Sequence, residues 1–257
     1  MNYQHIIFEK REGVARVTLN KPPLNVLDIA MMREITLALE DLIDDASVKV
    51  LVFDAAEDSK AFSAGVDVSE HTADLVDEMI EVFHRIFRLL DSLEMPTVAV
   101  VQRAALGGGC ELALFCDMVI ASEKASFGQP EIQVGVFPPI AVVALPDIIG
   151  PKKAMEMVLT GERISAAEAE RIGLANIVVP PDELPAAAEE FVSKLASLSG
   201  AVLRLTKRAA RMANTKPFSE RLSAVEELYL GPLMQTKDAN EGLAAFMEKR
   251  APVWKDK

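Results

Sequence analysis

The fold is decided by the stretch Leu106-Gly107-Gly108-Gly109-Cys110-Glu111-Leu112-Ala113-Leu114-Phe115-Cys116-Asp117. A strand-like run, Pro96–Val101, precedes it, and the apolar spacing after the glycines predicts a helix that begins at Gly108. Glycine lacks a Cβ, so the backbone can turn tightly, and the first N–H groups of the helix can hold an anion or a developing oxyanion. Glu111 lies in the first turn of this helix, and a second carboxylate, Glu131, follows. One oxyanion site with two carboxylates nearby indicates carbonyl activation coupled to acid–base chemistry.

The rest of the chain alternates short strands with amphipathic helices, which favours the α/β class. A change in composition near residues 195–200 predicts two parts, an α/β core over residues 1–197 and a helical region over residues 198–257. Asp28 and Asp182 are expected to cap the helices that follow them. Strands are predicted at 6–9, 14–19, 48–53, 96–101, 118–121 and 176–179, and further helices at 28–44, 74–93, 182–198, 201–213, 217–230 and 238–249.

The composition is that of a globular chain with a net charge of -12 over 257 residues. Binding of duplex nucleic acid needs clustered Lys and Arg, so this acidity argues against a nucleic-acid partner. No apolar run reaches the roughly 18 residues of a membrane span, and residues 1–5 do not begin a signal peptide, so we expect a cytoplasmic protein without a membrane anchor. Cys110 and Cys116 lie on different faces of one predicted helix without metal-ligand spacing, which predicts buried, reduced thiols and no metal site.

Five motifs resemble those of the enoyl-CoA hydratase/isomerase (crotonase) superfamily and occur in the order found in that family. Two of them contain the carboxylates, Gly107–Leu112 and Phe127–Glu131, and the others are Phe62–Asp67, Leu159–Ala175 and the tail Glu241–Arg250. Each motif is weakly specific by itself, but together they cover nearly the whole chain. The resemblance implies a crotonase-type spiral of ββα turns, followed by C-terminal helices that mediate trimer contacts. Periodicity alone does not distinguish that spiral from a doubly wound sheet.

The same resemblance implies an acyl-CoA hydratase, a lyase that uses no metal and no redox cofactor. The N–H groups of Ala64 and Gly108 would polarise the thioester carbonyl, and losing one such donor costs roughly 3–4 kcal/mol. In the family pattern hydratases carry both glutamates and many isomerases use one, so the presence of both favours hydration. Glu111 is the expected base for water and Glu131 the expected acid toward carbon, and close carboxylates of this kind titrate as a coupled pair.

The resemblance also implies which groups hold coenzyme A. Main-chain atoms of Ala64, Val66 and Asp67 stand where the family cradles the adenine end of CoA. Phe246 and Lys249 match tail positions that approach CoA, often from a neighbouring subunit. We therefore expect an acyl-CoA ligand and a homotrimer or homohexamer.

A departure from the common family pattern directly after Glu131 predicts the acyl group. Linear-chain hydratases have a glycine-rich turn there, whereas this chain reads Gly135-Val136-Phe137-Pro138-Pro139-Ile140-Ala141-Val142-Val143, which is stiffer and more apolar. Stiff apolar walls suit a flat ring, and this run and Val68–His71 resemble cyclohexa-1,5-diene-1-carbonyl-CoA hydratases of anaerobic benzoyl-CoA degradation. We expect a cyclic dienoyl-CoA substrate; the alternatives are a linear enoyl-CoA hydratase or isomerase of β-oxidation and a catalytically silent crotonase-fold scaffold. His71 could border this pocket, but a surface or packing role is favoured.

Overall fold

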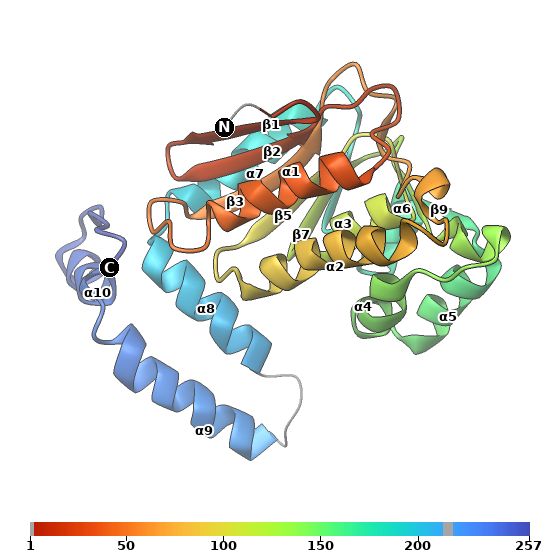
Figure 1. Ribbon diagram of the computed structural model, residues 1–257. Helices are drawn as coiled ribbons and strands as arrows, with labels where there is room; N and C mark the ends of the chain where they lie inside the picture. Colours follow the sequence, from red (N-terminus) through yellow and green to blue (C-terminus); the bar gives the residue numbers. More distant parts are fainter. Residues whose placement is uncertain (1–2, 213–217) are drawn as a thin grey trace.

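The computed structural model describes residues 3–212 and 218–257 and contains two β-sheets (Figure 1). In these residues the larger sheet has the strand order β1-β2-β3-β5-β7-β10 and is parallel except for the β1–β2 pair. The smaller sheet has the order β4-β6-β8-β9 and is parallel except for the β8–β9 pair. The strands are β1 (Ile6–Arg11), β2 (Val14–Leu19), β3 (Val50–Ala55), β4 (Ala61–Ser63), β5 (Thr97–Val101), β6 (Ala104–Leu106), β7 (Met118–Ser122), β8 (Ser126–Gly128), β9 (Arg163–Ser165) and β10 (Ile177–Val179).

Strands and helices repeat as units in which one strand joins the larger sheet, the next joins the smaller sheet and a helix follows. β3, β4 and α2 form one unit, β5, β6 and α3 form the next, and β7 and β8 lead into η2 and α4. This repetition confirms the α/β class and the predicted spiral of ββα turns. The helices are α1 (Ile29–Glu40), η1 (Val68–Glu70), α2 (Val76–Ser92), α3 (Gly108–Phe115), η2 (Pro130–Val134), α4 (Pro139–Ile149), α5 (Pro151–Thr160), α6 (Ala166–Arg171), α7 (Leu184–Ala196), α8 (Gly200–Met212), α9 (Phe218–Leu228), η3 (Tyr229–Leu233) and α10 (Lys237–Glu248).

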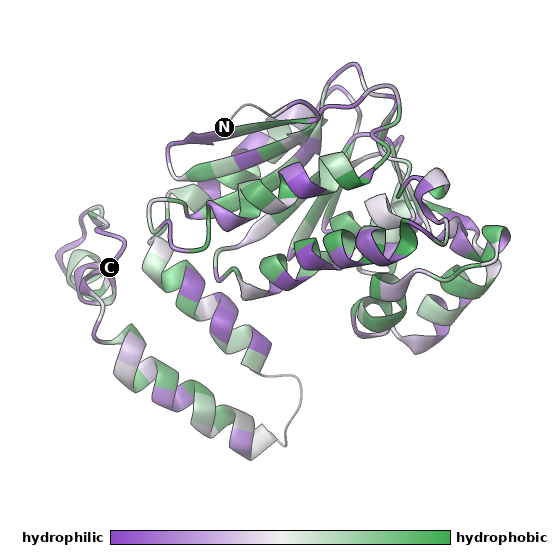
Figure 2. Cartoon of the chain, in the orientation of Figure 1, coloured by the Kyte–Doolittle hydropathy of each residue, from purple (hydrophilic) through white to green (hydrophobic). Residues whose placement is uncertain are grey.

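The larger sheet is covered on both faces, which explains why its inner strands are apolar without alternation. Successive residues of a strand point to opposite faces. In β3, Val50 and Val52 therefore pack with Leu184 of α7, whereas Leu51 and Phe53 join the main core with residues of α1 and α2. Figure 1 shows α7 on one face of this sheet and α1 and α2 on the other. Both α1 and α2 alternate hydrophilic and hydrophobic residues along their length in Figure 2, as expected for helices with one side on a core.

The helix caps agree with the sequence at α1 but not at α7. Asp28 caps α1 as predicted, because its side chain accepts a hydrogen bond of 2.9 Å from a backbone N–H in the first turn. The helix ends at Glu40, earlier than predicted. The prediction for Asp182 is wrong: the N–H of Glu183 bonds to the carbonyl of Pro180, which places Asp182 inside a turn, and no side chain caps α7.

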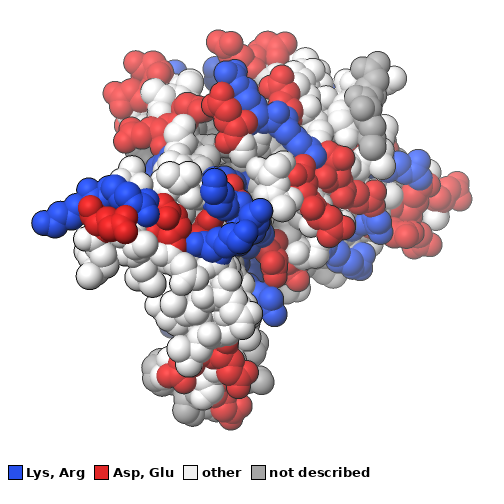
Figure 3. All heavy atoms as spheres, turned by 90° about the vertical axis from the view of Figure 1, so that its left-hand side faces the viewer, with Lys and Arg blue, Asp and Glu red and all other residues white. Residues whose placement is uncertain are grey.

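The helices α8, α9 and α10 form a C-terminal arm that leads away from the sheets (Figure 1). α8 begins at Gly200, near the predicted boundary, while the division of the chain at residue 197 into two parts stays a prediction. The buried Lys207 fixes α8 to the core, because its Nζ lies 2.6 Å from Asp117 Oδ2 and donates to the carbonyl of Met95 at 2.7 Å. The arm exposes large apolar side chains, which include Tyr229, Leu230, Leu243, Phe246 and Met247. Figure 3 shows a wide uncharged surface on the arm.

Candidate active site

A cavity of about 440 Å³ opens beside the glycine turn. Its wall is built from segments far apart in the sequence: the loop after β4, η1, α2, the start of α3, and the chain from η2 to the start of α4. Most of the wall is apolar, and Glu111 and Glu131 both reach it. The fold therefore brings the two predicted carboxylates to one cavity.

The glycine turn is held by neighbours that leave no room for side chains. Gly107 has a φ of +51°, a left-handed conformation that glycine adopts without strain, and it precedes the first residue of α3. A Cβ at each of the three glycines would meet another group at less than 3 Å: Glu131 Oε1 at Gly107 (2.5 Å), Val66 Cγ2 at Gly108 (2.7 Å) and Ser63 Cβ at Gly109 (2.5 Å). The three glycines thus let the start of α3 approach the second carboxylate and the loop after β4.

Glu111 is almost completely buried, with an exposed fraction of 1%. Its Oε1 accepts hydrogen bonds of 2.8 Å from the N–H groups of both Ile140 and Ala141, in the first turn of α4. α4 has no side-chain cap of its own, so the carboxyl group of α3 satisfies its N-terminus. Burial, together with the charge of Glu131, raises the pKa of Glu111 to about 8, although the two backbone donors oppose this increase.

Glu131 lies in η2, immediately after β8, and its carboxyl group packs against the backbone of Gly107. Its Oε2 is buried and, within residues 3–212 and 218–257, has no hydrogen-bond partner. Burial raises the pKa of Glu131 to about 7. Two neighbouring carboxyl groups that titrate near neutral pH can share one proton, which is the state that acid–base chemistry requires.

The pair of free backbone donors differs from the predicted pair. The N–H of Ala64 donates to the carbonyl of Leu24 at 2.9 Å, so it is already satisfied and does not serve the cavity. At Val66 the chain forms a parallel bridge in which Gly65 and Asp67, not Val66, bond to Leu27. The N–H of Val66 therefore points to the opposite side, toward α3, and Val66 lines the cavity.

Gly108 supplies the other free donor, in agreement with the sequence. A Cβ built on Gly65 would lie 3.4 Å from the nitrogen of Gly108, so the two loops are in contact. In the described part of the chain, neither the Gly108 N–H nor the Val66 N–H donates a hydrogen bond. We therefore assign the second donor to Val66 in place of Ala64. A strand pairing between distant segments decides this point, and the local motif does not reveal it.

The lining of the cavity is mainly apolar. Met79, Ile80 and Phe83 of α2 contribute to it, as do the segment Val134–Phe137 and Pro139. The prediction of a stiff apolar wall after Glu131 is therefore correct up to Pro139 and wrong beyond it. Val142 and Val143 belong to α4 and point away from the cavity, because Pro139 begins a helix. The sequence favoured a surface or packing role for His71, but His71 lines the cavity, which was the alternative.

The predicted CoA-binding residues of the tail are not near this cavity within one chain. Phe246 is exposed on α10, and Lys249 forms the C-terminal cap of the same helix. Figure 1 shows α10 and the helices α4 and α5 at opposite ends of the molecule. Ala64 and Val66 line the cavity, and Asp67 directly follows them as the cap of η1. One chain therefore brings together only the first of the two predicted CoA-binding sets.

Comparison with known proteins identifies the family. The profile of the enoyl-CoA hydratase/isomerase family matches residues 9–257. The chain belongs to this family. It is 40% identical over 256 residues to a probable enoyl-CoA hydratase of Mycobacterium bovis, with 98% of each chain covered. It is 34% identical over 252 residues to a cyclohexa-1,5-dienecarbonyl-CoA hydratase of Thauera aromatica, with 98% of this chain and 96% of the relative covered.

A solved structure supports the same family assignment. An enoyl-CoA hydratase from Bacillus anthracis superposes with a TM-score of 0.93 at 33% identity, over 99% of this chain and 100% of that one. The crotonase-type fold expected from the motifs is therefore confirmed. Among the described residues, no group of His, Cys, Asp and Glu is arranged to hold a metal ion, and no helix is long and apolar enough to cross a membrane.

The raised carboxyl pKa values predict how stability depends on pH. The unfolded chain releases the protons of both glutamates near pH 4.5, the ordinary pKa, whereas in the folded protein the pKa is about 8 for Glu111 and about 7 for Glu131. The contribution of these groups to the free energy of unfolding is thus complete below 4.5 and is lost as the pH rises through 7 and 8. We expect Glu111→Gln to reduce this loss by up to a few kcal/mol, at roughly 1.4 kcal/mol per pKa unit.

Urea unfolding at several pH values between about 5 and 8 measures this effect. Glutamine keeps an acceptor for Ile140 and Ala141, so α4 retains its cap. Glu123→Gln, at an exposed glutamate, is the matched control and should leave the pH dependence unchanged. A decline as steep in Glu111→Gln as in the wild-type protein would contradict the burial argument.

Proposed function

We propose that this protein is an enoyl-CoA hydratase, which adds water across a conjugated double bond of an acyl-CoA thioester. One observation carries the proposal: the buried carboxyl group of Glu111 and the partly buried one of Glu131, which titrate near neutral pH, share a cavity with two backbone N–H groups that have no acceptor among residues 3–212 and 218–257. The family membership and the names of the relatives support the same reaction. Family hydratases carry both glutamates, so this pair favours hydration over isomerisation.

The N–H groups of Val66 and Gly108 bind the thioester oxygen. Both come from backbone whose position is fixed, Val66 by its bridge to Leu27 and Gly108 by the start of α3. Negative charge grows on the thioester oxygen when water attacks the conjugated system, and fixed donors stabilise that charge without rearrangement. The positive end of the α3 dipole adds to this stabilisation.

The two glutamates supply and remove the protons. Because close carboxyl groups titrate as a pair, one proton is shared between them. We assign Glu111 as the base, because its pKa of about 8 exceeds that of Glu131, about 7, and the ionised group with the higher pKa is the stronger base. Glu111 takes the proton of water as a new C–O bond forms, and Glu131 is the stronger acid of the two. The electrons of the double bond move to a carbon of the conjugated system, which receives the proton of Glu131. The pair returns to its starting state when the proton passes from Glu111 to Glu131.

The acyl group is proposed to be the ring of cyclohexa-1,5-diene-1-carbonyl-CoA. The apolar walls around Phe83 and Phe137, and the relative from Thauera aromatica, support a flat ring. A linear enoyl-CoA is the alternative, supported by the higher identity to the probable enoyl-CoA hydratase. The substrate carries its own CoA group, and we propose no further cofactor.

We propose that the arm completes the CoA site between chains. The apolar surface formed by Tyr229, Leu230 and Phe246 is too exposed for a helix that remains uncovered. If a second chain covers it, Phe246 and Lys249 can approach the CoA of a neighbour, where the lysine would face a phosphate. A homotrimer or homohexamer follows from this reading, together with main-chain contacts of Ala64, Val66 and Asp67 to CoA.

Removal of either carboxyl group should nearly abolish hydration. We expect Glu111→Gln and Glu131→Gln each to lower kcat by about 10²–10⁴-fold, because each removes one partner of the acid–base pair. The measurement is loss of absorbance of an unsaturated acyl-CoA, with circular dichroism as the check on folding. A silent scaffold would show no turnover in the wild-type protein either, and turnover near the wild-type rate in a variant would remove that glutamate from the mechanism.

The choice of acyl group is tested by comparing cyclohexa-1,5-diene-1-carbonyl-CoA with crotonyl-CoA. We expect kcat/KM to be higher for the ring by roughly tenfold or more, since it fills the apolar walls. Phe137→Ala should narrow this ratio, whereas Val143→Ala, on the outer side of α4, should not. A higher kcat/KM for crotonyl-CoA would overturn the ring and leave the general hydratase proposal.

The assembly is tested by light scattering of the purified protein. We expect a mass three or six times that of one chain, because the arm exposes apolar side chains that a neighbour can cover. Leu230→Asp should shift the mass toward that of one chain, since it places a charge in that surface. A wild-type mass equal to one chain would refute the shared CoA site.

A further inference from the structure

One wall of the cavity is a short segment that is only loosely connected to the fold. Residues 67–71, which we call the η1 wall, contribute Val68 and His71 to the cavity lining. Both side chains are exposed on the outer side, and the residues that continue to α2, 72–75, are exposed as well. The position of this wall therefore depends on a few contacts, because little apolar packing holds it.

Most hydrogen bonds of the η1 wall stay within it. Asp67 accepts from the N–H of Ser69 at 2.9 Å and from its hydroxyl at 2.7 Å, and His71 Nδ1 donates to the carbonyl of Asp67 at 3.1 Å. These bonds shape the wall but do not place it. Of residues 68–75, all of which the structure describes, only Glu70 forms a side-chain hydrogen bond to another element.

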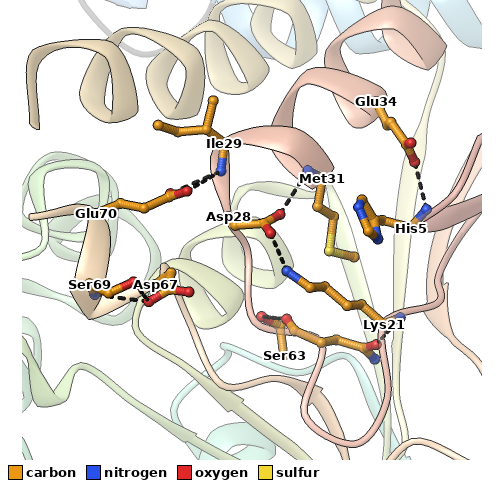
Figure 4. A network of polar contacts seen from close by, with 11 residues as sticks. His5, Lys21, Asp28, Ile29, Met31, Glu34, Ser63, Asp67, Ser69 and Glu70 are labelled. Atoms are coloured by element: carbon orange, nitrogen blue, oxygen red, sulfur yellow. Dashed lines mark hydrogen bonds and ion pairs between the residues drawn. The ribbon is translucent and has the colours of Figure 1, made fainter. Parts of the chain in front are cut away.

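Glu70 reaches the N-terminus of α1. Its Oε1 and Oε2 accept from the N–H of Ile29 at 3.1 and 2.9 Å (Figure 4). Ile29 is the first residue of α1, and Asp28, the residue before it, caps the N–H of Met31 in the same first turn. Since the positive end of a helix dipole favours a carboxylate, the contact joins a charged group to a rigid partner. Lys21 pairs with Asp28 beside it and keeps this helix end in place.

We propose that Glu70 is a positioning residue that sets the η1 wall and thereby the affinity of the cavity for its acyl-CoA. This inference rests on the proposed hydratase function. Glu70 does not line the cavity and touches no reacting atom, so it acts through Val68 and His71. Val66 is held separately, by its bridge to Leu27, so the oxyanion donors do not depend on Glu70.

The experiment compares Glu70→Ala, Glu70→Gln and a matched control, Glu34→Ala. Glu34 lies on α1, the helix that Glu70 contacts, and its two oxygens likewise accept from backbone N–H groups, those of Gln4 and His5, both at 2.8 Å. That contact fixes the N-terminal strand and not the cavity. Glutamine at position 70 keeps one oxygen that can accept from Ile29.

We expect Glu70→Ala to raise KM roughly tenfold with a smaller change in kcat, as the loss of a charged hydrogen bond allows. Glu70→Gln should restore KM to within about twofold, and Glu34→Ala should leave KM unchanged. An unchanged KM in Glu70→Ala, or an equal rise in Glu34→Ala, would overturn the positioning role.

Amide hydrogen exchange of residues 67–76 gives a readout that is independent of activity. We expect faster exchange in Glu70→Ala than in the wild-type protein or in Glu34→Ala, because the wall loses its only side-chain tether to α1 among the described contacts. If the wild-type protein hydrates no acyl-CoA, the hydratase proposal fails. The exchange rates still show whether Glu70 holds the η1 wall in place. Equal exchange in all variants would refute it.

Discussion

The structure depends on three consecutive positions that have no Cβ. Gly107, Gly108 and Gly109 each face a different neighbour, and a methyl group on any of them would come within 3 Å of it. Without this clearance α3 could not begin where it does. The N–H of Gly108 would then not lie beside the N–H of Val66, and the carboxyl group of Glu131 could not pack against the backbone of Gly107. The close approach of a helix start to two loops is thus the geometric condition for the site.

The second dependence is electrostatic and joins folding to chemistry. Glu111 is buried at a cost, and the N-terminus of α4 repays part of it by donating two hydrogen bonds. The same bonds give α4 the cap that its own residues lack. A carboxyl group that stabilises a helix and also titrates near neutral pH serves both purposes with one set of contacts. The neighbouring segment, η2 to Pro139, is therefore held where the cavity needs its wall.

Much of this could be predicted from the sequence, because the signals are local. The glycine run, the helix from Gly108, the Asp28 cap and the pairing of Glu111 with Glu131 follow from short motifs and spacing. The second donor could not be predicted in this way. Whether Ala64 or Val66 has a free N–H depends on Leu24 and Leu27, which approach from some 40 residues earlier in the chain. The wall after Glu131 was predicted only as far as Pro139, where the helix turns the following valines outward. The predicted contacts of Phe246 and Lys249 with CoA are not formed within one chain, where Phe246 is exposed and Lys249 ends α10.

The two hydrogen bonds on Glu111 also make its oxygens chemically different. Oε1 already accepts from Ile140 and Ala141, so a proton on Oε1 would meet two other protons. Any proton that Glu111 carries must reside on Oε2, and the group cannot exchange its oxygens by rotating without breaking both bonds. A freely rotating carboxyl group offers its proton from either side, whereas this one offers it from a single direction. The fold has in this way made the two oxygens of a symmetric side chain different, so that Glu111 can take up or release a proton only at Oε2.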